Sequence, residues 1–200
     1  MHFAASRHAP RRLFNYGGRA SEVIDRLRSL VMQHTPRRDS IDLNEAILEV
    51  IAQTRDEARV NEISLTSSLA GDLPRVEDDR VQLQQVILNL IVNAIGAMGA
   101  VSGQPRELRI ASAQDDAGGG RVEVRDSGPG IESSQAERLF EAFYTTKAKG
   151  IGIGLSISRS IIEAHGGRLW AGPNARHGAV FQFSLPVDKA SSYLAYAGGS

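Results

Sequence analysis

The feature that most constrains this chain is a long apolar run, Val86–Met98, that contains two asparagines. Asn89 and Asn93 lie four residues apart, so in a helix their amides project from the same face. The run is interrupted too often for a membrane helix, which needs roughly 18 apolar residues, and buried amides need hydrogen-bond partners. The pattern therefore predicts a core helix from about Asp79 to Met98 that carries two polar groups into the protein.

Helices and strands alternate along the rest of the chain. Asp42 is the expected N-cap of one helix, over residues 42–58, because Glu45 follows three residues later and an apolar stripe comes next. The other expected elements are helices at 21–35, 134–140 and 154–165, and strands at 63–68, 106–113, 121–126, 167–171 and 180–185. This order favours a two-layer α/β (α+β) sandwich, in which a mixed sheet has its helices on one face and is preceded by one helix.

Composition and charge narrow the class of protein. Lys plus Arg equal Asp plus Glu, at 23 each, which argues against a general electrostatic affinity for nucleic acid or anionic lipid. The chain has no cysteine, which excludes disulfides and thiolate metal sites. Neither a membrane segment nor a signal peptide is apparent, so we expect a cytoplasmic protein. Its 200 residues suffice for one domain and a short extension.

The two asparagines are candidates for a metal site. An amide oxygen is a fair ligand for Mg²⁺, which prefers oxygen and shares its coordination shell with water and phosphates. For a single asparagine, helix capping or hydrogen bonding in the core would be the simpler explanation. A pair at this spacing is stronger evidence for a site than either residue alone.

Two glycine-rich segments follow the helix. Asp126–Ile131 comes after an expected strand, so a carboxylate lies at the strand end and the glycines let the backbone approach a flat ligand. Such a carboxylate can accept a hydrogen bond from the exocyclic amine of adenine, although an ordinary Asx turn is the simpler explanation for this segment alone. Gly150–Ser156 leads into a helix, an arrangement that presents backbone N–H groups to phosphate. It has neither Rossmann nor Walker spacing, and a plain flexible loop would also explain it.

Taken together, these segments resemble the ordered motifs of bacterial sensor histidine kinases. The matching runs are residues 82–94 (N box), Asp126–Ile131 (first glycine box), 140–147 (F box), Gly150–Leu155 (second glycine box) and 156–167 (closing helix). The resemblance covers residues 19–187. It implies the Bergerat ATP-binding fold, which these kinases share with gyrase-type ATPases, heat-shock ATPase chaperones and mismatch-repair ATPases.

The resemblance implies ATP and Mg²⁺ as cofactors, with Asn89 and Asn93 as the catalytic pair. Asn93 would bind Mg²⁺, and Asn89 lies where related ATPases carry a glutamate that activates water, so hydrolysis should be slow. Asp126 would read adenine, while Lys147 and Lys149 could neutralise phosphate charge. The other implied nucleotide contacts are Ala97, Gly128, Gly130, Ile131, Phe143, Thr146, Gly150, Ile151, Gly152, Ile153, Gly154, Leu155 and Ala179.

Two positions depart from the pattern of this family. Ala179 stands where many relatives have threonine, so one hydroxyl contact to the base is missing. Gly96 stands where an acidic residue is common, a change to which the sequence assigns no consequence.

A phosphoacceptor histidine of the kind found in complete histidine kinases is missing from the sequence. That histidine is usually followed directly by an acidic residue and, a few positions later, by proline, and none of the 5 histidines has this pattern. His165 is expected to be a partner of the C-terminal helix dipole. We therefore expect a lead-in at 1–18, a remnant of the second dimerisation helix at 19–38, the catalytic domain at 39–187 and a tail at 188–200.

The predicted function is that of the catalytic domain of a two-component sensor histidine kinase. It would transfer the γ-phosphoryl group of ATP to a histidine on a separate chain or missing segment. The expected partners are a dimerisation and phosphoacceptor domain, indirectly a response regulator, and a second copy through the N-terminal helix. Two alternatives are an ATP-binding regulatory module and an oligomerisation module, neither of which would transfer phosphate.

Overall fold

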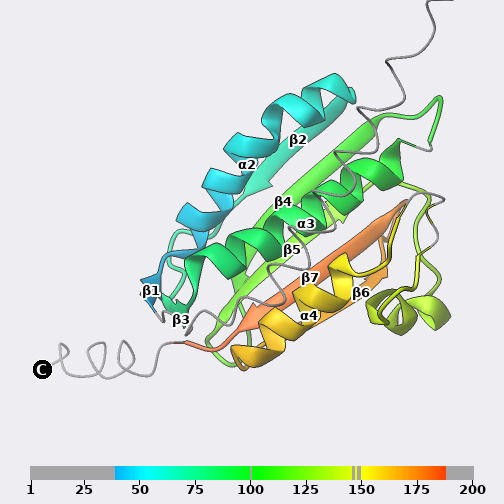
Figure 1. The fold of residues 1–200 in the computed structure, drawn as a ribbon. Coiled ribbons are helices and arrows are strands. Elements are labelled where there is room, and N and C mark those ends of the chain that lie inside the picture. Colours follow the sequence, from blue (N-terminus) through cyan, green and yellow to red (C-terminus); the bar gives the residue numbers. More distant parts are fainter. Residues whose placement is uncertain (1–38, 100, 146, 148–149, 188–200) are drawn as a thin grey trace, which may run out of the picture. The chain divides into compact units, whose positions relative to one another are not determined.

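The computed structural model describes residues 39–99, 101–145, 147 and 150–187 of the chain (Figure 1). The expected lead-in at 1–18, the helix at 21–35 within the remnant at 19–38, and the tail at 188–200 therefore lie outside the described residues. All described elements belong to one unit of the fold.

A mixed five-stranded sheet forms one layer. Its strands, in spatial order, are β2 (Ile63–Ser68), β4 (Arg106–Gln114), β5 (Gly120–Asp126), β7 (Ala179–Leu185) and β6 (Arg168–Pro173). β2 is parallel to β4, and the other neighbours are antiparallel. A parallel pair needs a crossover connection, and the helix between β2 and β4 supplies it. The predicted strands are confirmed, although β6 extends beyond its predicted end.

Three helices form the second layer, on one face of the sheet: α2 (Leu43–Val60), α3 (Arg80–Met98) and α4 (Gly154–Ala164) (Figure 1). The side chain of Asp42 caps α2 by accepting from the backbone N–H groups of Asn44 and Glu45, as predicted. Asp79 caps α3 in the same way. The predicted two-layer sandwich is therefore confirmed.

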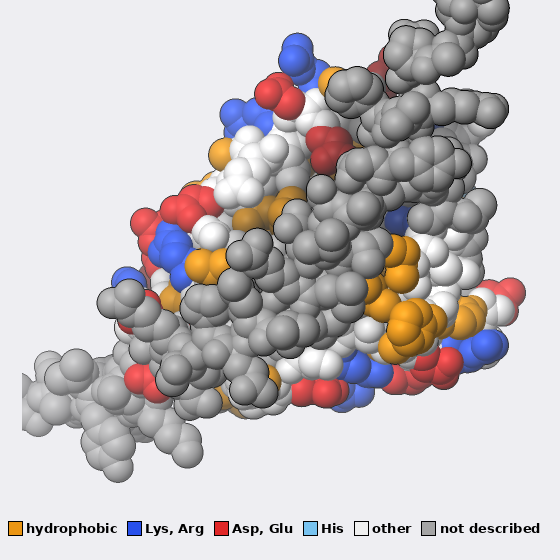
Figure 2. Space-filling view, viewed as in Figure 1, with side chains coloured by type: hydrophobic (Ala, Val, Ile, Leu, Met, Phe, Trp, Pro, Cys, Tyr) orange, Lys and Arg blue, Asp and Glu red, His pale blue; other side chains and the backbone are white. Residues whose placement is uncertain are grey.

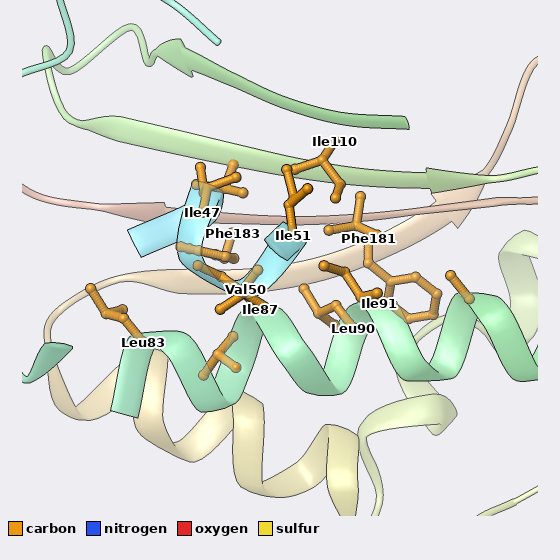
Figure 3. Packing of buried hydrophobic residues seen from close by; sticks show 14 of the residues in the cluster. Ile47, Val50, Ile51, Leu83, Ile87, Leu90, Ile91, Ile110, Phe181 and Phe183 are labelled. Atoms are coloured by element: carbon orange, nitrogen blue, oxygen red, sulfur yellow. The ribbon is translucent and has the colours of Figure 1, made fainter. Parts of the chain in front are cut away.

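Alternation along the strands explains why one face of the sheet is apolar. In β5, Val122 and Val124 are buried, whereas Glu123 and Arg125 are only half-buried. Successive strand residues point to opposite faces, so the apolar set packs beneath the helices and the polar set faces away from them. Figure 3 shows this core between the sheet (Ile110, Phe181, Phe183), α2 (Ile47, Val50, Ile51) and α3 (Leu83, Ile87, Leu90, Ile91).

α3 runs through the middle of the helical layer and packs against α2, α4 and β5. Among the described residues it is the one helix that is long and apolar enough to cross a membrane. A core helix passes the same test, and here Leu83, Ile87 and Leu90 are fully buried in the core. The apolar character of α3 is therefore explained by packing within the domain.

The outer side of α2 carries acidic and basic side chains, which gather over this helix in Figure 2. Glu45 and Glu49 both pair with Arg80 at the start of α3, at 2.9 and 2.6 Å. Exposed pairs of this kind contribute little to stability. The two helices are therefore held together mainly by their buried apolar faces.

Two parts of the fold differ from the sequence-based expectation. The predicted helix at 134–140 is instead two 3-10 turns, η1 (Ser133–Gln135) and η2 (Glu137–Phe140). In these turns only Phe140 is buried, so the segment lacks the apolar stripe that stabilises a longer α-helix. The sequence also does not predict the antiparallel pair of β1 (Asp39–Ile41) and β3 (Val76–Asp78), because strands this short show no clear alternation.

A buried polar pair ties β3 to the end of α4. Oδ1 of Asp78 accepts from the backbone N–H of Asp79 at 2.7 Å and lies 2.9 Å from Nε2 of His165. The other ring nitrogen of His165 lies 2.8 Å from the carbonyl oxygen of Ile161 in the last turn of α4. His165 therefore contacts the helix end as expected, and it also has an acidic partner that the sequence does not predict.

Asp78→Ala should destabilise the fold by about 2–4 kcal/mol, because it leaves the His165 ring and the N–H of Asp79 without their buried acceptor. Denaturation in urea measures this loss. The matched control is Glu77→Ala, at an exposed position of the same strand, which should change stability by less than about 0.5 kcal/mol. Equal losses in the two variants would contradict a role for the buried pair.

Candidate functional site

The predicted site residues lie at two ends of a strip along α3. At one end, Gly128 of the loop after β5 lies beside Ala97, and a Cβ on this glycine would be 3.3 Å from the Cβ of Ala97. At the other end, Gly154 at the start of α4 lies against Asn89. We call these two regions the Asp126 end and the Gly154 end.

The carboxylate of Asp126 is anchored through one of its two oxygens. Oδ1 accepts from the backbone N–H of Gly128 at 2.8 Å and from that of Ala179 at 3.2 Å. Pairing of β5 with β7 brings Ala179 to this place. The residue is 2% exposed, and among the described residues the hydrogen bonds to its carboxylate all go to Oδ1. Oδ2 therefore remains as an acceptor for a ligand.

Burial raises the pKa of Asp126 above its ordinary value of 3.8, because the charged form loses solvation inside the protein. The hydrogen bonds from Gly128 and Ala179, and the charge of Lys147, act in the opposite direction. The net change in pKa is upward. Keeping this carboxylate ionised therefore costs free energy in the folded protein. A hydrogen-bond donor on a ligand would offset that cost.

The turn between β6 and β7 packs directly on Asp126. Gly178 has a φ of 95°, and a Cβ at this position would collide with the backbone carbonyl oxygen of Asp126. Nδ2 of Asn174 donates to that same oxygen at 3.2 Å. Because only glycine tolerates both the positive φ and the close approach, Gly178 is what allows the N–H of Ala179 to reach the carboxylate.

At the Gly154 end, the amide of Asn89 is buried between α3 and α4. Asn89 is 8% exposed, and its Nδ2 donates to Oγ of Ser158 at 2.8 Å. Ser158 in turn donates to the carbonyl oxygen of Gly154 at 3.1 Å. A Cβ on Gly154 would lie 2.6 Å from Oδ1 of Asn89, so glycine is required where α4 begins. The structure therefore brings Asn89 together with the second glycine segment.

Lys147 reaches across to α3. Its Nζ donates to the backbone carbonyl oxygen of Asn93 at 3.1 Å and to the amide Oδ1 at 3.3 Å. This amide oxygen therefore already accepts a hydrogen bond from a cation. In the described part of the chain, no group of three or more His, Cys, Asp or Glu side chains could hold a metal by itself. Mg²⁺ would thus need phosphate oxygens and water in addition to Asn93.

Gly96 makes room for this lysine. A Cβ at position 96 would lie 2.9 Å from Nζ of Lys147, closer than side chains normally approach. The ammonium group occupies the space that a larger residue would take. Gly96, to which the sequence assigns no consequence, therefore permits the contact between Lys147 and Asn93.

The segment between η2 and α4 is held by a backbone contact. The N–H of Phe143 donates to the carbonyl oxygen of Gly152 at 2.9 Å, and both residues have positive φ, 68° and 74°. Phe143 is 76% exposed. The structure therefore brings the backbone of Phe143 to the second glycine segment but does not gather its ring with the asparagines.

The other predicted residues of this region differ in burial. Ile153 is buried, whereas Ile151 is 37% exposed. Two predicted nucleotide contacts, Thr146 and Lys149, lie outside the described residues. The remaining positions are Gly130 with a φ of 86°, Ile131 and Leu155 packed against the core, and exposed Gly150.

Sequence reasoning misses two side chains that support the site. Ser158 lies one helical turn after Gly154, so its place on the same face of α4 was a usable signal. Asn174 gives no such signal, because its approach to Asp126 depends on the order of strands in the sheet.

The family of the chain follows from a comparison with known proteins. Residues 78–189 match the family of histidine kinase-, DNA gyrase B-, and HSP90-like ATPases. The match covers more than half of the chain, and the chain belongs to this family. The fold and the order of the asparagines and glycine segments agree with this membership.

Two curated sensor proteins are similar in sequence. The C4-dicarboxylate transport sensor protein DctS of Rhodobacter capsulatus is 40% identical over 171 residues, which are 84% of this chain and 26% of the relative. Sensor protein FixL of Bradyrhizobium diazoefficiens is 44% identical over 171 residues, 84% of this chain and 33% of the relative. The chain therefore spans about a quarter to a third of the length of these relatives.

A solved structure has a similar fold. The catalytic domain of histidine kinase ThkA is 38% identical, with a TM-score of 0.66, and the match covers 74% of this chain and 95% of that domain. The similarity thus extends over nearly the whole of a histidine kinase catalytic domain. The fold described above is that of such domains.

Gly96→Ala should stabilise the fold by about 0.5–1 kcal/mol, because alanine is favoured over glycine at an exposed helix position. The same change should push Nζ of Lys147 away from Asn93, because the atom it meets is the flexible end of that side chain. Urea denaturation measures the gain. As a control, Gly96→Ala in a Lys147→Met background should show the full helical gain, and a net loss there would contradict this account.

The free energy of unfolding of Asp126→Asn, relative to that of the unchanged chain, should increase as the pH rises above about 4. The raised pKa means that the folded state binds more protons than the unfolded state between 3.8 and the folded pKa. Asp126 therefore loses stability as the pH rises through this window, whereas asparagine does not titrate and keeps an acceptor for Gly128 and Ala179. Urea denaturation at several pH values measures the difference, and a difference independent of pH would refute it.

Proposed function

We propose that the chain is the ATP- and Mg²⁺-binding catalytic domain of a sensor histidine kinase. The observation that carries the proposal is the buried carboxylate of Asp126, which is anchored through Oδ1 to two backbone N–H groups. Its second oxygen suits the exocyclic amine of adenine, a hydrogen-bond donor. Membership of an ATPase family supports the same ligand.

The Gly154 end suits the phosphates of ATP. The first N–H groups of α4 have no acceptor within the helix, and among the described residues no side chain caps them. Together with the helix dipole they favour an anion at this point. Lys147 adds a positive charge beside Asn93, and we propose that it turns to the phosphates when nucleotide binds.

Asn93 would hold Mg²⁺ through Oδ1, with the remaining positions taken by phosphate oxygens and water. When bound, this ion neutralises negative charge on the phosphates. The protein itself would orient the nucleotide between Asp126 and Gly154, so that the γ-phosphoryl group faces out of the pocket. Positioning of this kind supplies most of the catalysis in phosphoryl transfer.

In the proposed reaction, a ring nitrogen of the acceptor histidine attacks the γ-phosphorus. The N–P bond forms as the bond from phosphorus to the bridging oxygen breaks, the electron pair leaves on ADP, and the ring loses one proton to solvent. Asn89 carries an amide, which cannot take a proton from water at neutral pH. Hydrolysis should therefore be slow compared with transfer to histidine.

The acceptor histidine of the proposal belongs to a separate chain or to a segment outside this one. Of the described histidines, His165 is buried beside Asp78, and His177 lies in the turn that follows β6. We propose that residues 39–187 are the catalytic domain and that 19–38 belong to a dimerisation helix, through which two copies could pair. A response regulator would then receive the phosphoryl group from that histidine, in the cytoplasm.

The test is phosphotransfer from γ-labelled ATP, with Mg²⁺, to a separately supplied sensor-kinase dimerisation domain that contains its histidine. We expect label on that domain in an acid-labile form. Asp126→Asn should lower ATP affinity, measured by calorimetry, by about tenfold or more, because an amide N–H would then face the amine of adenine. The fold should be retained.

Each outcome of this experiment discriminates between the functions. Binding of ATP without transfer of label would favour the regulatory or oligomerisation module over the kinase. Unchanged affinity in Asp126→Asn would show that the carboxylate does not read adenine. Loss of transfer together with loss of affinity in this variant supports the proposed function.

A further inference from the structure

A short chain of hydrogen bonds links the two helices at the Gly154 end. Asn89 of α3 donates to Ser158 of α4, and Ser158 donates to the carbonyl oxygen of Gly154, at 2.8 and 3.1 Å. Ser158 is 2% exposed and Asn89 is 8% exposed. Hydrogen bonds in such a buried setting have strong preferences for direction, because an unpaired group there is costly.

This chain determines which way the amide of Asn89 points. A serine hydroxyl has one hydrogen, and that of Ser158 is given to Gly154. Towards Asn89 the hydroxyl can then only accept, so it must meet the NH₂ group and not the oxygen. Oδ1 of Asn89 is consequently turned to the start of α4, 2.6 Å from where a Cβ on Gly154 would lie.

The oxygen has a different environment from the NH₂ group. Among the described residues, Asn89 makes its side-chain hydrogen bond through Nδ2. Its Oδ1 has no such partner there and is not fully buried. Oδ1 is thus an acceptor at the edge of the Gly154 end. A ligand or a water molecule held by a ligand can reach it.

From this geometry we propose that Ser158 is a positioning residue for phosphoryl transfer. It holds the amide of Asn89 so that Oδ1 accepts a hydrogen bond from water held at the phosphates. The inference rests on the proposed function and adds to it a residue that does not touch the nucleotide. Without Ser158 the amide could turn over and present an N–H donor to that water instead.

The neighbouring serines of α4 show that a serine on this helix does not in general bond to α3. Ser156 and Ser160 also donate to backbone carbonyl oxygens, of Ile153 at 2.9 Å and of Ser156 at 3.1 Å. Ser160 lies on the exposed side of α4 and makes no bond to α3 among the described residues. It therefore offers a matched control, with the same residue type and the same bond to its own helix.

The experiment compares Ser158→Ala, Ser158→Cys and Ser160→Ala in the phosphotransfer assay described above. Ser158→Ala should lower kcat by about five- to twentyfold while KM for ATP changes by less than about twofold, because an oriented polar group is lost and not a contact with ATP. Ser158→Cys keeps a group of similar size in the buried position, and its kcat should lie between those of Ser158→Ala and the unchanged chain. Ser160→Ala should match the unchanged chain.

Two further measurements separate positioning from a general loss of structure. In an Asn89→Ala background, Ser158→Ala should have no further effect on kcat, since the two residues act through one interaction. The side-chain NH₂ resonances of Asn89, recorded by NMR without nucleotide, should shift in Ser158→Ala and Ser158→Cys but not in Ser160→Ala. Those of Asn93 should remain in place in all variants.

An Asn89 NH₂ signal that is unaffected by Ser158→Ala would overturn the positioning role, whatever the activity. Equal losses of kcat in Ser158→Ala and Ser160→Ala, or a rise in KM in place of a fall in kcat, would overturn it as well. Absence of transfer by the unchanged chain would overturn the proposed function and with it the catalytic part of this inference. The NMR result distinguishes these two failures, because it requires neither ATP nor an acceptor.

Discussion

Burial of α3 against the sheet is the interaction on which the rest of the structure depends. Leu83, Ile87 and Leu90 fill the core beneath this helix, and the sheet offers them one apolar face. α2 lies on one side of this helix and α4 on the other. The amide of Asn89 contacts α4, and that of Asn93 contacts Lys147. The same helix therefore supplies much of the hydrophobic core and the polar centre of the site, so core packing sets the positions of both amides.

The two ends of the site follow a common physical rule. A buried polar side chain must be paired to be tolerated, yet a binding group must keep an atom for its ligand. Asp126 meets both demands because its Oδ1 accepts hydrogen bonds from the backbone N–H groups of Gly128 and Ala179. Asn89 meets them because its Nδ2 donates a hydrogen bond to Oγ of Ser158. In each case one atom anchors the side chain, and the other atom makes no hydrogen bond among the described residues.

Features that depend on neighbouring residues in the sequence could be predicted well. The cap at Asp42, the strand at 63–68 and the extent of α3 all follow from spacings of a few residues. The pair β1 and β3 and the 3-10 turns at 133–140 could not, because such short elements are held by tertiary contacts and not by a periodic pattern. Family motifs indicated the candidate residues of the site, but not the hydrogen bonds that orient them.

Local patterns in the chain thus suffice to name the elements, the fold class and the kinds of side chain at the site, since helix and strand periods and glycine turns are read over short distances. Tertiary structure alone decides the atoms that meet. The direction of the Asn89 amide needs Ser158, and the place of Lys147 needs the space above Gly96. These partners are separated by dozens of residues, and only the packing of α3 against α4 and the order of the strands bring them within hydrogen-bonding distance.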